Sequence, residues 1–302
     1  MSASNKLLLA PPAVPWRVVL VSRILPVVLG FDAVVREAGH QPVALLTFLD
    51  SDGRYGGFDI TPVLKDVPSD LDIVMPARRS SIAPLLRGLQ PDLVVCMGFP
   101  WKIPADALAV PTLGWVNGHP SLLPRHRGPV PVAWTIRNGE EEMGVTFHRM
   151  DAELDTGAIL AQATMAIGEY AEPDVFYPRT GPVVMDVLRQ ALERLASGDE
   201  GTPQPEGGEY EGFFSDEDAW LDRARPAVEL HRLVWAWRYT IPAGELRGAL
   251  VELDGETMRV LASSLTEVDG ARRLECADGP LWLVELEPAQ AGETATSPTS
   301  SS

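Results

Sequence analysis

Short apolar runs alternate with amphipathic stretches along the first third of the chain. The apolar runs have the composition of buried strands, and they lie at 17–21, 42–47, 71–75 and 92–96. Between them, helical spacing and helix-starting residues predict helices at 26–38 and 82–89, the second capped by Ser80 and Ser81. Strands that alternate with helices are typical of a parallel sheet with crossover helices. The pattern therefore predicts an α/β fold with a Rossmann-like, mostly parallel sheet.

The middle of the chain continues this pattern. A loop rich in proline, glycine and arginine at 117–129 precedes the next expected elements, which are a helix at 131–138, strands at 144–149 and 158–167, and a helix at 183–196. We therefore expect a first domain over 16–198, preceded by a flexible extension at 1–15.

The last third of the chain has a different pattern. The stretch 199–212 is rich in glycine and glutamate, which is typical of a linker. A helix at 226–238 is followed by four short apolar runs, at 250–253, 258–261, 273–276 and 281–284. Asp-Gly pairs between the first two runs and between the last two favour hairpin turns. This predicts a small β-barrel or sandwich over 213–287, with a disordered tail at 288–302.

The charge balance limits the partners that the chain could have. It carries 42 acidic and 25 basic side chains, for a formal net charge of −17. Broad binding to nucleic acid depends on Lys and Arg at phosphates. The balance therefore argues against such binding, although a local basic patch stays possible.

Cysteine use and hydropathy indicate the compartment. Cys96 and Cys276 show no metal-ligand spacing, so we expect no metal site. Two cysteines in 302 residues fit a reducing compartment. No apolar run reaches the ~20 residues of a membrane helix, and the proline-broken N-terminus is a poor signal peptide. We therefore expect a cytoplasmic protein without membrane attachment, and we leave its oligomeric state open.

Candidate chemistry gathers where a buried strand ends. Asn117 and His119 stand two residues apart, so both can project from the carboxyl edge of the sheet, where open α/β sheets bind ligands. The Asn117 amide can donate to a developing oxyanion, and His119 can donate to the same oxygen or relay a proton. Asp155 could orient His119 and favour its charged form. An amine that attacks an activated acyl carbon needs this set of groups.

The motifs around these residues resemble those of a known enzyme family. They are NGHPSLLP at 117–124, RGP at 127–129, GVTFHRMD at 144–151 and LDTG at 154–157. This string is similar to the signature of the 10-formyltetrahydrofolate-dependent formyltransferases, which include methionyl-tRNA and sugar-amine formyltransferases. The resemblance implies that Asn117 and His119 polarise the formyl oxygen and that Asp155 completes a catalytic triad. It also implies 10-formyltetrahydrofolate as the formyl donor.

The resemblance implies further site residues. The donor pocket would be formed from the loop 97–104 and the last motif, through Met97, Gly98, Phe99, Trp101, Ile103, Asp151 and Leu154. Asp151 has a structural alternative, which is to hold the turn before Asp155. Contacts to the acceptor are expected from Ser22, Arg125, Arg127 and Gly128. The alternative for the basic cluster at 125–127 is a solvated loop.

The resemblance extends beyond the catalytic motifs. The stretches 213–238 and 277–283 look like the start and the last strand of the C-terminal domain of methionyl-tRNA and certain sugar formyltransferases. This implies an OB-like barrel over 213–287, shortened between those stretches. Glycinamide ribonucleotide formyltransferase resembles the catalytic domain only, so the chain length disfavours it.

Other interpretations of single residues are weaker. Asp155-Thr156-Gly157 also resembles the aspartic-protease motif, but that chemistry needs two carboxylates and the motif occurs once. The stretch 22–26 has no glycine, which argues against a dinucleotide turn and against NAD. His40, His148 and His231 have no neighbours in sequence that suggest chemistry, and we predict structural roles for them.

The identity of the acceptor depends on residues outside these motifs. Enzymes that formylate tRNA carry a basic insertion after the second strand, whereas the stretch 50–59 has three acids and one arginine. Phosphate contacts need positive charge. We therefore expect a small or carrier-bound amine, such as an amino sugar or a specialised metabolite. Initiator tRNA is the alternative, and a non-catalytic folate-binding protein is a remote one.

Overall fold

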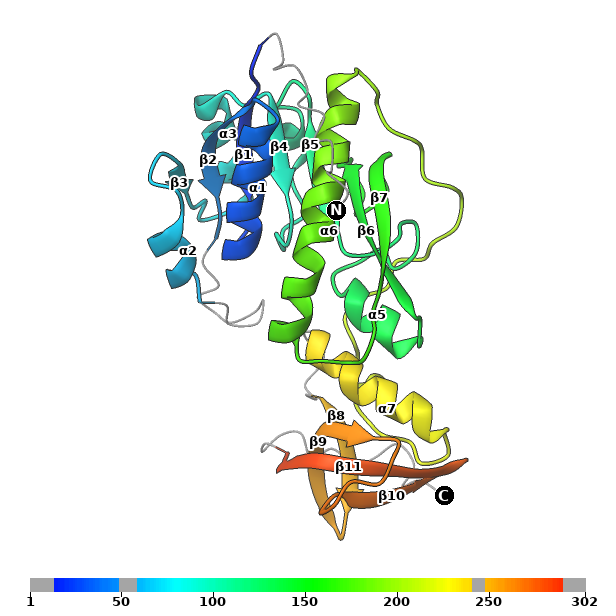
Figure 1. The fold of residues 1–302 in the computed structure, drawn as a ribbon. Coiled ribbons are helices and arrows are strands. Elements are labelled where there is room, and N and C mark those ends of the chain that lie inside the picture. The colour runs from blue at the N-terminus through cyan, green and yellow to red at the C-terminus, as the bar shows by residue number, and fades with distance from the viewer. Residues whose placement is uncertain (1–13, 49–58, 241–247, 290–302) are drawn as a thin grey trace, which may run out of the picture. The chain divides into compact units, whose positions relative to one another are not determined.

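The predicted strands of the first part of the chain pair into one sheet of seven strands (Figure 1). The computed structural model describes residues 14–48, 59–240 and 248–289. The strands are β1 (Arg17–Val21), β2 (Gln41–Leu46), β3 (Asp72–Val74), β4 (Leu93–Cys96), β5 (Trp115–His119), β6 (Glu142–Arg149) and β7 (Ile159–Ala166). Their order is β3-β2-β1-β4-β5-β6-β7, with β1 to β5 parallel and β6 antiparallel to β5. The prediction of a mostly parallel α/β sheet is confirmed.

Helices cover both faces of this sheet (Figure 1). Side chains of successive strand residues point to opposite faces, so Val18 and Leu20 enter one core and Val19 and Val21 enter the other. The first core is completed by α1 (Leu25–Glu37) and α6 (Pro173–Ala196), and the second by α3 (Ile82–Leu89) and α4 (Ala105–Leu108). A short helix, α2 (Thr61–Asp66), follows β2, and a 3-10 turn, η1 (Arg79–Ser81), precedes α3.

The chain forms two units. The first unit comprises Met1–Pro124, Gly144–Ala163 and Arg179–Gly207, and the second comprises Arg125–Met143, Thr164–Pro178 and Gly208–Ser302. The chain therefore passes from one unit to the other several times, so that β6, β7 and α6 each contribute residues to both.

The second unit contains an antiparallel sheet that packs with helices. Its sheet has the order β10-β11-β9-β8, made of β8 (Ala249–Leu253), β9 (Glu256–Ser264), β10 (Arg272–Cys276) and β11 (Gly279–Pro288). Its helical elements are α5 (Pro131–Arg137), η2 (Asp216–Asp218), α7 (Ala227–Ala236) and η3 (Trp237–Tyr239). Asp254 and Gly255 both have positive φ, at 52° and 85°, as a tight hairpin turn requires. The expected small β-domain is therefore confirmed as a separate four-stranded antiparallel sheet.

Some expected elements differ from the structure. The helix expected at 183–196 begins at Pro173, because Phe176 in its first turn is buried and tertiary packing overrides the prolines that interrupt the pattern. Ser81 precedes α3 as expected, but its side chain makes no capping hydrogen bond. Most of the acidic stretch 50–59, the extension at 1–13 and the tail at 290–302 lie outside the described residues.

The strand order places the candidate residues at one edge of the sheet. The order reverses between β1 and β4, which is the switch point where open α/β sheets bind ligands beyond the strand carboxyl ends. Ser22 follows β1, the loop 97–104 follows β4, and Asn117 and His119 end β5. The described part of the sheet therefore brings together these three predicted parts of the site.

Candidate active site

Strand β5 presents Asn117 and His119 from the same face, with Gly118 between them. A Cβ at Gly118 would lie 2.8 Å from Cζ of Phe147, so a larger residue here would displace that buried ring. His119 is 5% exposed, and Asn117 is half-buried. Strand β6 runs beside β5 and sets His148 directly opposite Asn117. The local sequence therefore brings an amide and two imidazoles to one place.

The predicted triad is joined by this second histidine. Nδ1 of His119 lies 3.7 Å from Oδ1 of Asp155, and the two side chains are 6% and 13% exposed. Nε2 of His148 lies 3.6 Å from the same carboxylate oxygen and 3.3 Å from Nδ2 of Asn117. The described residues thus form a cluster in which His148, expected to be structural, bridges Asn117 and Asp155.

The hydrogen bonds of His148 fix the orientation of the Asn117 amide. Nδ1 of His148 lies 2.7 Å from the carbonyl oxygen of Arg149. A carbonyl only accepts, so Nδ1 must carry a proton, and in the neutral ring Nε2 is then an acceptor. The Asn117 amide nitrogen donates to that acceptor, and its second N–H points elsewhere. Sequence reasoning missed this role, although the alternation of β6 beside β5 carried the signal.

Asp155 lies in a tightly held loop between β6 and β7. Its φ is +59°, a left-handed conformation that non-glycine residues rarely adopt. Oδ1 of Asp151 accepts bonds from the Glu153 amide at 3.0 Å and the Thr156 hydroxyl at 2.7 Å. A Cβ at Gly157 would lie 1.9 Å from the Arg149 carbonyl oxygen. Asp151 thus braces this loop, which is the structural alternative to its predicted contact with the donor.

The loop after β4 carries the residues predicted for the donor pocket. Phe99 and Trp101 are half-buried and stack edge to face at 5.5 Å, and both contact the ring of Phe48. Ile103 is 5% exposed and lies in the core with α3 and α4. The structure therefore offers an aromatic wall from Phe99 and Trp101, whereas Ile103 anchors the loop.

The remaining donor-side residues flank the same edge. Met97 directly follows β4, and Gly98 has a φ of +70°, so glycine suits this turn. Leu154 is 41% exposed, and its neighbour Glu153 forms an ion pair of 3.3 Å with Lys102. The loop after β4 and the Asp155 loop are thus linked at their surface. Contact of these residues with the donor stays a prediction.

Ser22 and Cys96 lie buried at the carboxyl ends of β1 and β4. Ser22 is fully buried, and its hydroxyl accepts a bond from the Ile24 amide at 3.2 Å. Its predicted contact with the acceptor stays a prediction. Burial raises the pKa of the Cys96 thiol to about 12, and the charge of Asp155 acts in the same direction. The thiol beside Asn117 is therefore protonated at neutral pH and is a poor nucleophile.

Three of the residues predicted to contact the acceptor belong to the second unit, and they are Arg125, Arg127 and Gly128. Arg125 forms an ion pair with Glu140, and Arg127 donates to the Gly208 carbonyl at 3.1 Å. Gly128 has a φ of +131°, and a Cβ there would lie 2.0 Å from the Glu211 carbonyl oxygen. This loop is therefore bound closely to the stretch 208–211.

His126 strengthens that attachment. Its Nδ1 lies 2.6 Å from Glu211 and its Nε2 lies 2.8 Å from Glu140. Each ring nitrogen of His126 therefore faces a carboxylate of the same unit. Within the cluster at 125–127, Arg125 and His126 are thus engaged with acids of their own unit, and Arg127 binds a backbone carbonyl.

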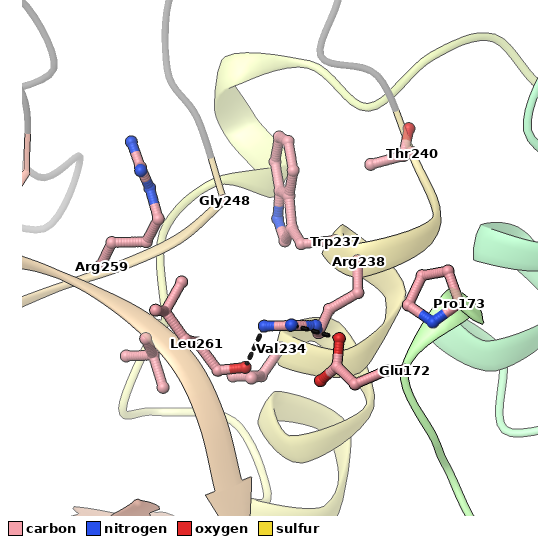
Figure 2. Close-up of a pocket in the computed structure, with 10 residues that line it drawn as sticks. Glu172, Pro173, Val234, Trp237, Arg238, Thr240, Gly248, Arg259 and Leu261 are labelled. Carbon is pink, nitrogen blue, oxygen red and sulfur yellow. Dashed lines mark hydrogen bonds and ion pairs between the residues drawn. The ribbon is translucent and has the colours of Figure 1, made fainter. Parts of the chain in front are cut away.

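The second unit also contains a cavity of about 360 Å³ (Figure 2). Figure 2 shows Arg238 reaching across it to Glu172 and to the Leu261 carbonyl, which accepts at 3.0 Å. Arg259, on the opposite side of the cavity, pairs with Glu287 at 2.5 Å. Both guanidinium groups are therefore engaged by carboxylates, and the cavity holds none of the predicted site residues.

The described residues form neither a metal-binding cluster nor a membrane-spanning helix. Within 14–48, 59–240 and 248–289, no group of three His, Cys, Asp or Glu side chains is placed to hold a metal ion. In the same ranges, no helix is both long and apolar enough to span a membrane.

Comparison with known proteins relates this arrangement to formyl transfer. The family model described as Formyl transferase matches residues 74–191. The methionyl-tRNA formyltransferase of Roseiflexus sp. (strain RS-1) is 32% identical over 298 aligned positions, which cover 91% of this chain and 89% of the relative. That of Myxococcus xanthus (strain DK1622) is 33% identical, covering 82% of both chains.

Solved structures share the fold at lower sequence identity. HypX from Aquifex aeolicus, in complex with tetrahydrofolic acid, has a TM-score of 0.63 at 19% identity. The match covers 92% of this chain but only 45% of HypX. The sugar 3N-formyl transferase WlaRD, solved with dTDP and 5-N-formyl-THF, has a TM-score of 0.62 at 14% identity, over 90% and 97% of the two chains. Its sequence relatives show that the chain belongs to the formyl transferase family and is a formyl-transferring enzyme.

Proposed function

We propose that this enzyme moves a formyl group from 10-formyltetrahydrofolate to the primary amine of a small or carrier-bound acceptor. The observation that carries the proposal is the cluster of buried His119 with half-buried Asn117 and Asp155 at the sheet edge. The folate donor is supported by family membership and by the aromatic wall of Phe99 and Trp101 beside that edge. An amino sugar or a specialised metabolite fits the acceptor class.

The proposed transfer is direct. The neutral amine attacks the formyl carbon and forms a new C–N bond, while the carbonyl electrons move to the oxygen. Asn117 donates one amide N–H to that oxygen, and His119 donates from Nε2 because its Nδ1 faces Asp155. Each such donor typically contributes ~10²–10³ in rate. No covalent intermediate through Cys96 is needed, and its raised pKa disfavours one.

Collapse of the intermediate completes the reaction. The bond between the formyl carbon and N10 of the folate breaks, and N10 takes up the proton that the attacking amine has released. The attacking amine loses a proton, for which the Asp155 carboxylate, acting through a water molecule, is the proposed acceptor. Asp155 also holds the charge of His119 through the 3.7 Å contact with Nδ1.

The acceptor proposal rests on how the second unit uses its positive charges. Seven of its ten described arginines pair with carboxylates of the same unit: Arg125–Glu140, Arg137–Asp218, Arg225–Glu229, Arg238–Glu172, Arg259–Glu287, Arg272–Asp254 and Arg273–Glu275. A surface that grips tRNA needs cations directed at phosphates. Charges neutralised in this way, on a chain with a net charge of −17, favour a small acceptor.

Methionyl-tRNA is the second candidate acceptor. Methionyl-tRNA formyltransferases are sequence relatives over most of the chain, which favours it. The two candidates differ in salt dependence. Binding to tRNA releases counterions, so its kcat/KM should fall steeply with salt, whereas a small amine should be far less sensitive.

An assay with both acceptors distinguishes them. Purified protein is supplied with 10-formyltetrahydrofolate and either initiator methionyl-tRNA or a nucleotide-linked amino sugar, at low and moderate salt. We expect faster turnover of the amino sugar. A higher kcat/KM for methionyl-tRNA would overturn the acceptor proposal and leave the formyl transfer intact.

Variants of the cluster test the assigned chemistry. We expect Asn117→Ala and His119→Ala each to lower kcat by about 10²–10³ while thermal unfolding changes little. His231→Gln in the second unit is the matched control and should keep wild-type kcat. Retained transfer in His119→Ala would contradict the assigned role.

A further inference from the structure

The stretch after α6, expected to be a linker, is bonded to the catalytic part of the first unit. Ile159 and Thr202 exchange two backbone hydrogen bonds of 2.8 Å each. Nε of Arg149 donates to the Glu200 carbonyl at 3.1 Å, and its guanidinium pairs with the Glu200 carboxylate at 2.7 Å. Residues 200–202 thus lie along β7 and the end of β6, close to the loop that carries Asp155.

One side chain of this stretch holds the Asp155 loop. Nε2 of Gln204 donates to the Asp155 carbonyl at 2.8 Å and to the Gly157 carbonyl at 2.9 Å. A single amide group therefore uses both of its N–H bonds on the two carbonyls that flank Thr156. Both bonds have the length of good N–H···O hydrogen bonds.

The loop needs such a restraint. Asp155 has a φ of +59°, a left-handed conformation that aspartate adopts more readily than most non-glycine residues but that is still less favourable than the right-handed one. Its carboxylate lies 3.7 Å from His119, which it supports in the proposed mechanism, and 3.6 Å from His148. A small rotation of this backbone would move the carboxylate away from both imidazoles.

We propose that Gln204 is a positioning residue that holds the Asp155 carboxylate beside His119 through the backbone of the Asp155 loop. This inference rests on the proposed function, in which Asp155 supports His119. The amide nitrogen of Gln204 binds the backbone carbonyls of Asp155 and Gly157, so its proposed effect on the reaction passes through the position of Asp155.

The first test removes the donors and keeps the size. In Gln204→Leu we expect kcat to fall roughly ten- to hundredfold, because displacements of about 1 Å in a catalytic group have costs of this size. The KM of each substrate should change less than about twofold, since the proposed role of Gln204 is to position Asp155 and not to bind substrate. The acceptor is whichever of methionyl-tRNA and the nucleotide-linked amino sugar turns over faster. Gln190→Leu is the matched control, because Gln190 is exposed on α6 and bonds to Asp186 of the same helix.

Hydrogen exchange gives a readout that does not depend on turnover. In Gln204→Leu, amides of the peptide that covers 153–159 should exchange faster than in wild type, and those of α1 should not change. Unchanged exchange in this peptide would overturn the proposal whatever the activity.

Gln204→Glu adds a test that a purely structural role would not pass. Its ionised carboxylate cannot donate, whereas its protonated form donates one bond. The activity of this variant relative to wild type should therefore rise as the pH is lowered toward the ordinary glutamate pKa of ~4.3. A flat ratio between pH 8 and pH 5 would overturn the positioning role.

The variant Asp155→Asn distinguishes a failure of the proposed function from a failure of the inference about Gln204. If Asp155→Asn keeps wild-type activity, the proposed function of the cluster fails. If Asp155→Asn is inactive while Gln204→Leu behaves as wild type, the inference about Gln204 alone fails.

Discussion

His148 shows how much a single buried ring adds to the cluster. It is 1% exposed, and its two nitrogens have different partners. Nδ1 faces the Arg149 carbonyl, and Nε2 faces the Asn117 amide. The ring thus determines which atom of the amide points toward it. An Asn side chain with this constraint keeps one N–H available for an oxyanion without reorganisation at the moment of reaction.

A variant at His148 tests this orientation. In His148→Leu the amide of Asn117 loses its acceptor and can rotate, so we expect kcat to fall about tenfold with KM nearly unchanged. Steady-state kinetics with both substrates measures this. Gln supplies an acceptor oxygen, so His148→Gln should recover part of the loss. Equal kcat in the wild type and His148→Leu would show that Asn117 needs no such partner.

Cys96 makes a further prediction about a single residue. Burial raises the pKa of its thiol to about 12, so the reactive thiolate is scarce at pH 8. Burial also raises the pKa of Cys276, which is partly exposed. We expect a thiol reagent to modify Cys96 slowly in the native protein and rapidly in urea, as followed by mass spectrometry. Rapid native modification of Cys96 would contradict its burial.

Two glycines differ in how closely their surroundings are packed. A Cβ at Gly157 would lie 1.9 Å from the Arg149 carbonyl oxygen, whereas a Cβ at Gly181, inside α6, would meet nothing within 4 Å. A contact with fixed backbone cannot be relieved by rotating a side chain. A glycine in a helix interior costs about 0.5–1 kcal/mol relative to alanine.

These two sites form a matched pair of alanine variants. We expect Gly157→Ala to lower the free energy of unfolding by about 2 kcal/mol or more and to lower kcat, because the Asp155 loop must shift. Gly181→Ala should raise the free energy of unfolding by about 0.5–1 kcal/mol and keep kcat. Urea unfolding and steady-state kinetics measure both. A destabilised Gly181→Ala would mean that α6 is more closely packed there than its surroundings indicate.

Elements also show which parts of the fold the sequence could predict. The strands β1, β2 and β4 are predicted from apolar runs, since a buried parallel strand is apolar along most of its length. Strand β5 extends to His119, into the stretch expected to be a loop because Asn117 and His119 interrupt its apolar pattern. The start of α6 was missed, because prolines and Gly181 in its first half suppress a local helix signal that only packing restores. The local hydrophobic pattern is thus sufficient to predict an element whose residues are buried uniformly along its length.

Some residues of the candidate site can likewise be predicted from the sequence, and others cannot. Asn117, His119 and Asp155 were predicted because the motifs that carry them are continuous in sequence. Gln204 was missed because its partner Asp155 lies 49 residues away, and no spacing rule links a glycine-rich stretch to a turn so distant. His148 was judged from its neighbours in sequence, while its functional neighbours lie on the adjacent strand.

At the scale of the whole molecule, each unit contains a histidine that folding keeps neutral. Burial lowers the pKa of His40 from its ordinary 6.5, against a smaller opposing effect of Asp92. His40 stacks on Trp16 at 4.0 Å and accepts a bond from its backbone amide at 3.2 Å. Burial also lowers the pKa of His231, and Arg232 adds to this. Nδ1 of His231 lies 2.9 Å from the Ser263 hydroxyl.

The lowered values set the sign of the pH dependence. Each histidine binds a proton more tightly in the unfolded chain than in the folded one, so acid favours unfolding. The stability that depends on the neutral rings is complete above the unfolded pKa of about 6.5 and is lost as the pH falls from there through the folded values. Asp59 and Asp199, whose pKa values hydrogen bonds lower, contribute above their ordinary value of 3.8, so their loss occurs at lower pH. The histidine effect can therefore be observed separately between pH 7.5 and pH 5.5.

A double variant isolates this contribution. Wild type and His40→Gln/His231→Gln are unfolded by urea at pH 7.5, 6.5 and 5.5, with each unit followed by hydrogen exchange because two units need not unfold together. Wild type should lose stability in both units over this range, and the variant should lose less. Single variants assign the effect: His40→Gln should flatten the pH dependence in the first unit only, and His231→Gln in the second only. Identical slopes in the wild type and the double variant would show that both rings keep ordinary pKa values in the folded chain. In that case the net charge of −17, and the self-repulsion it brings, would determine the response to acid.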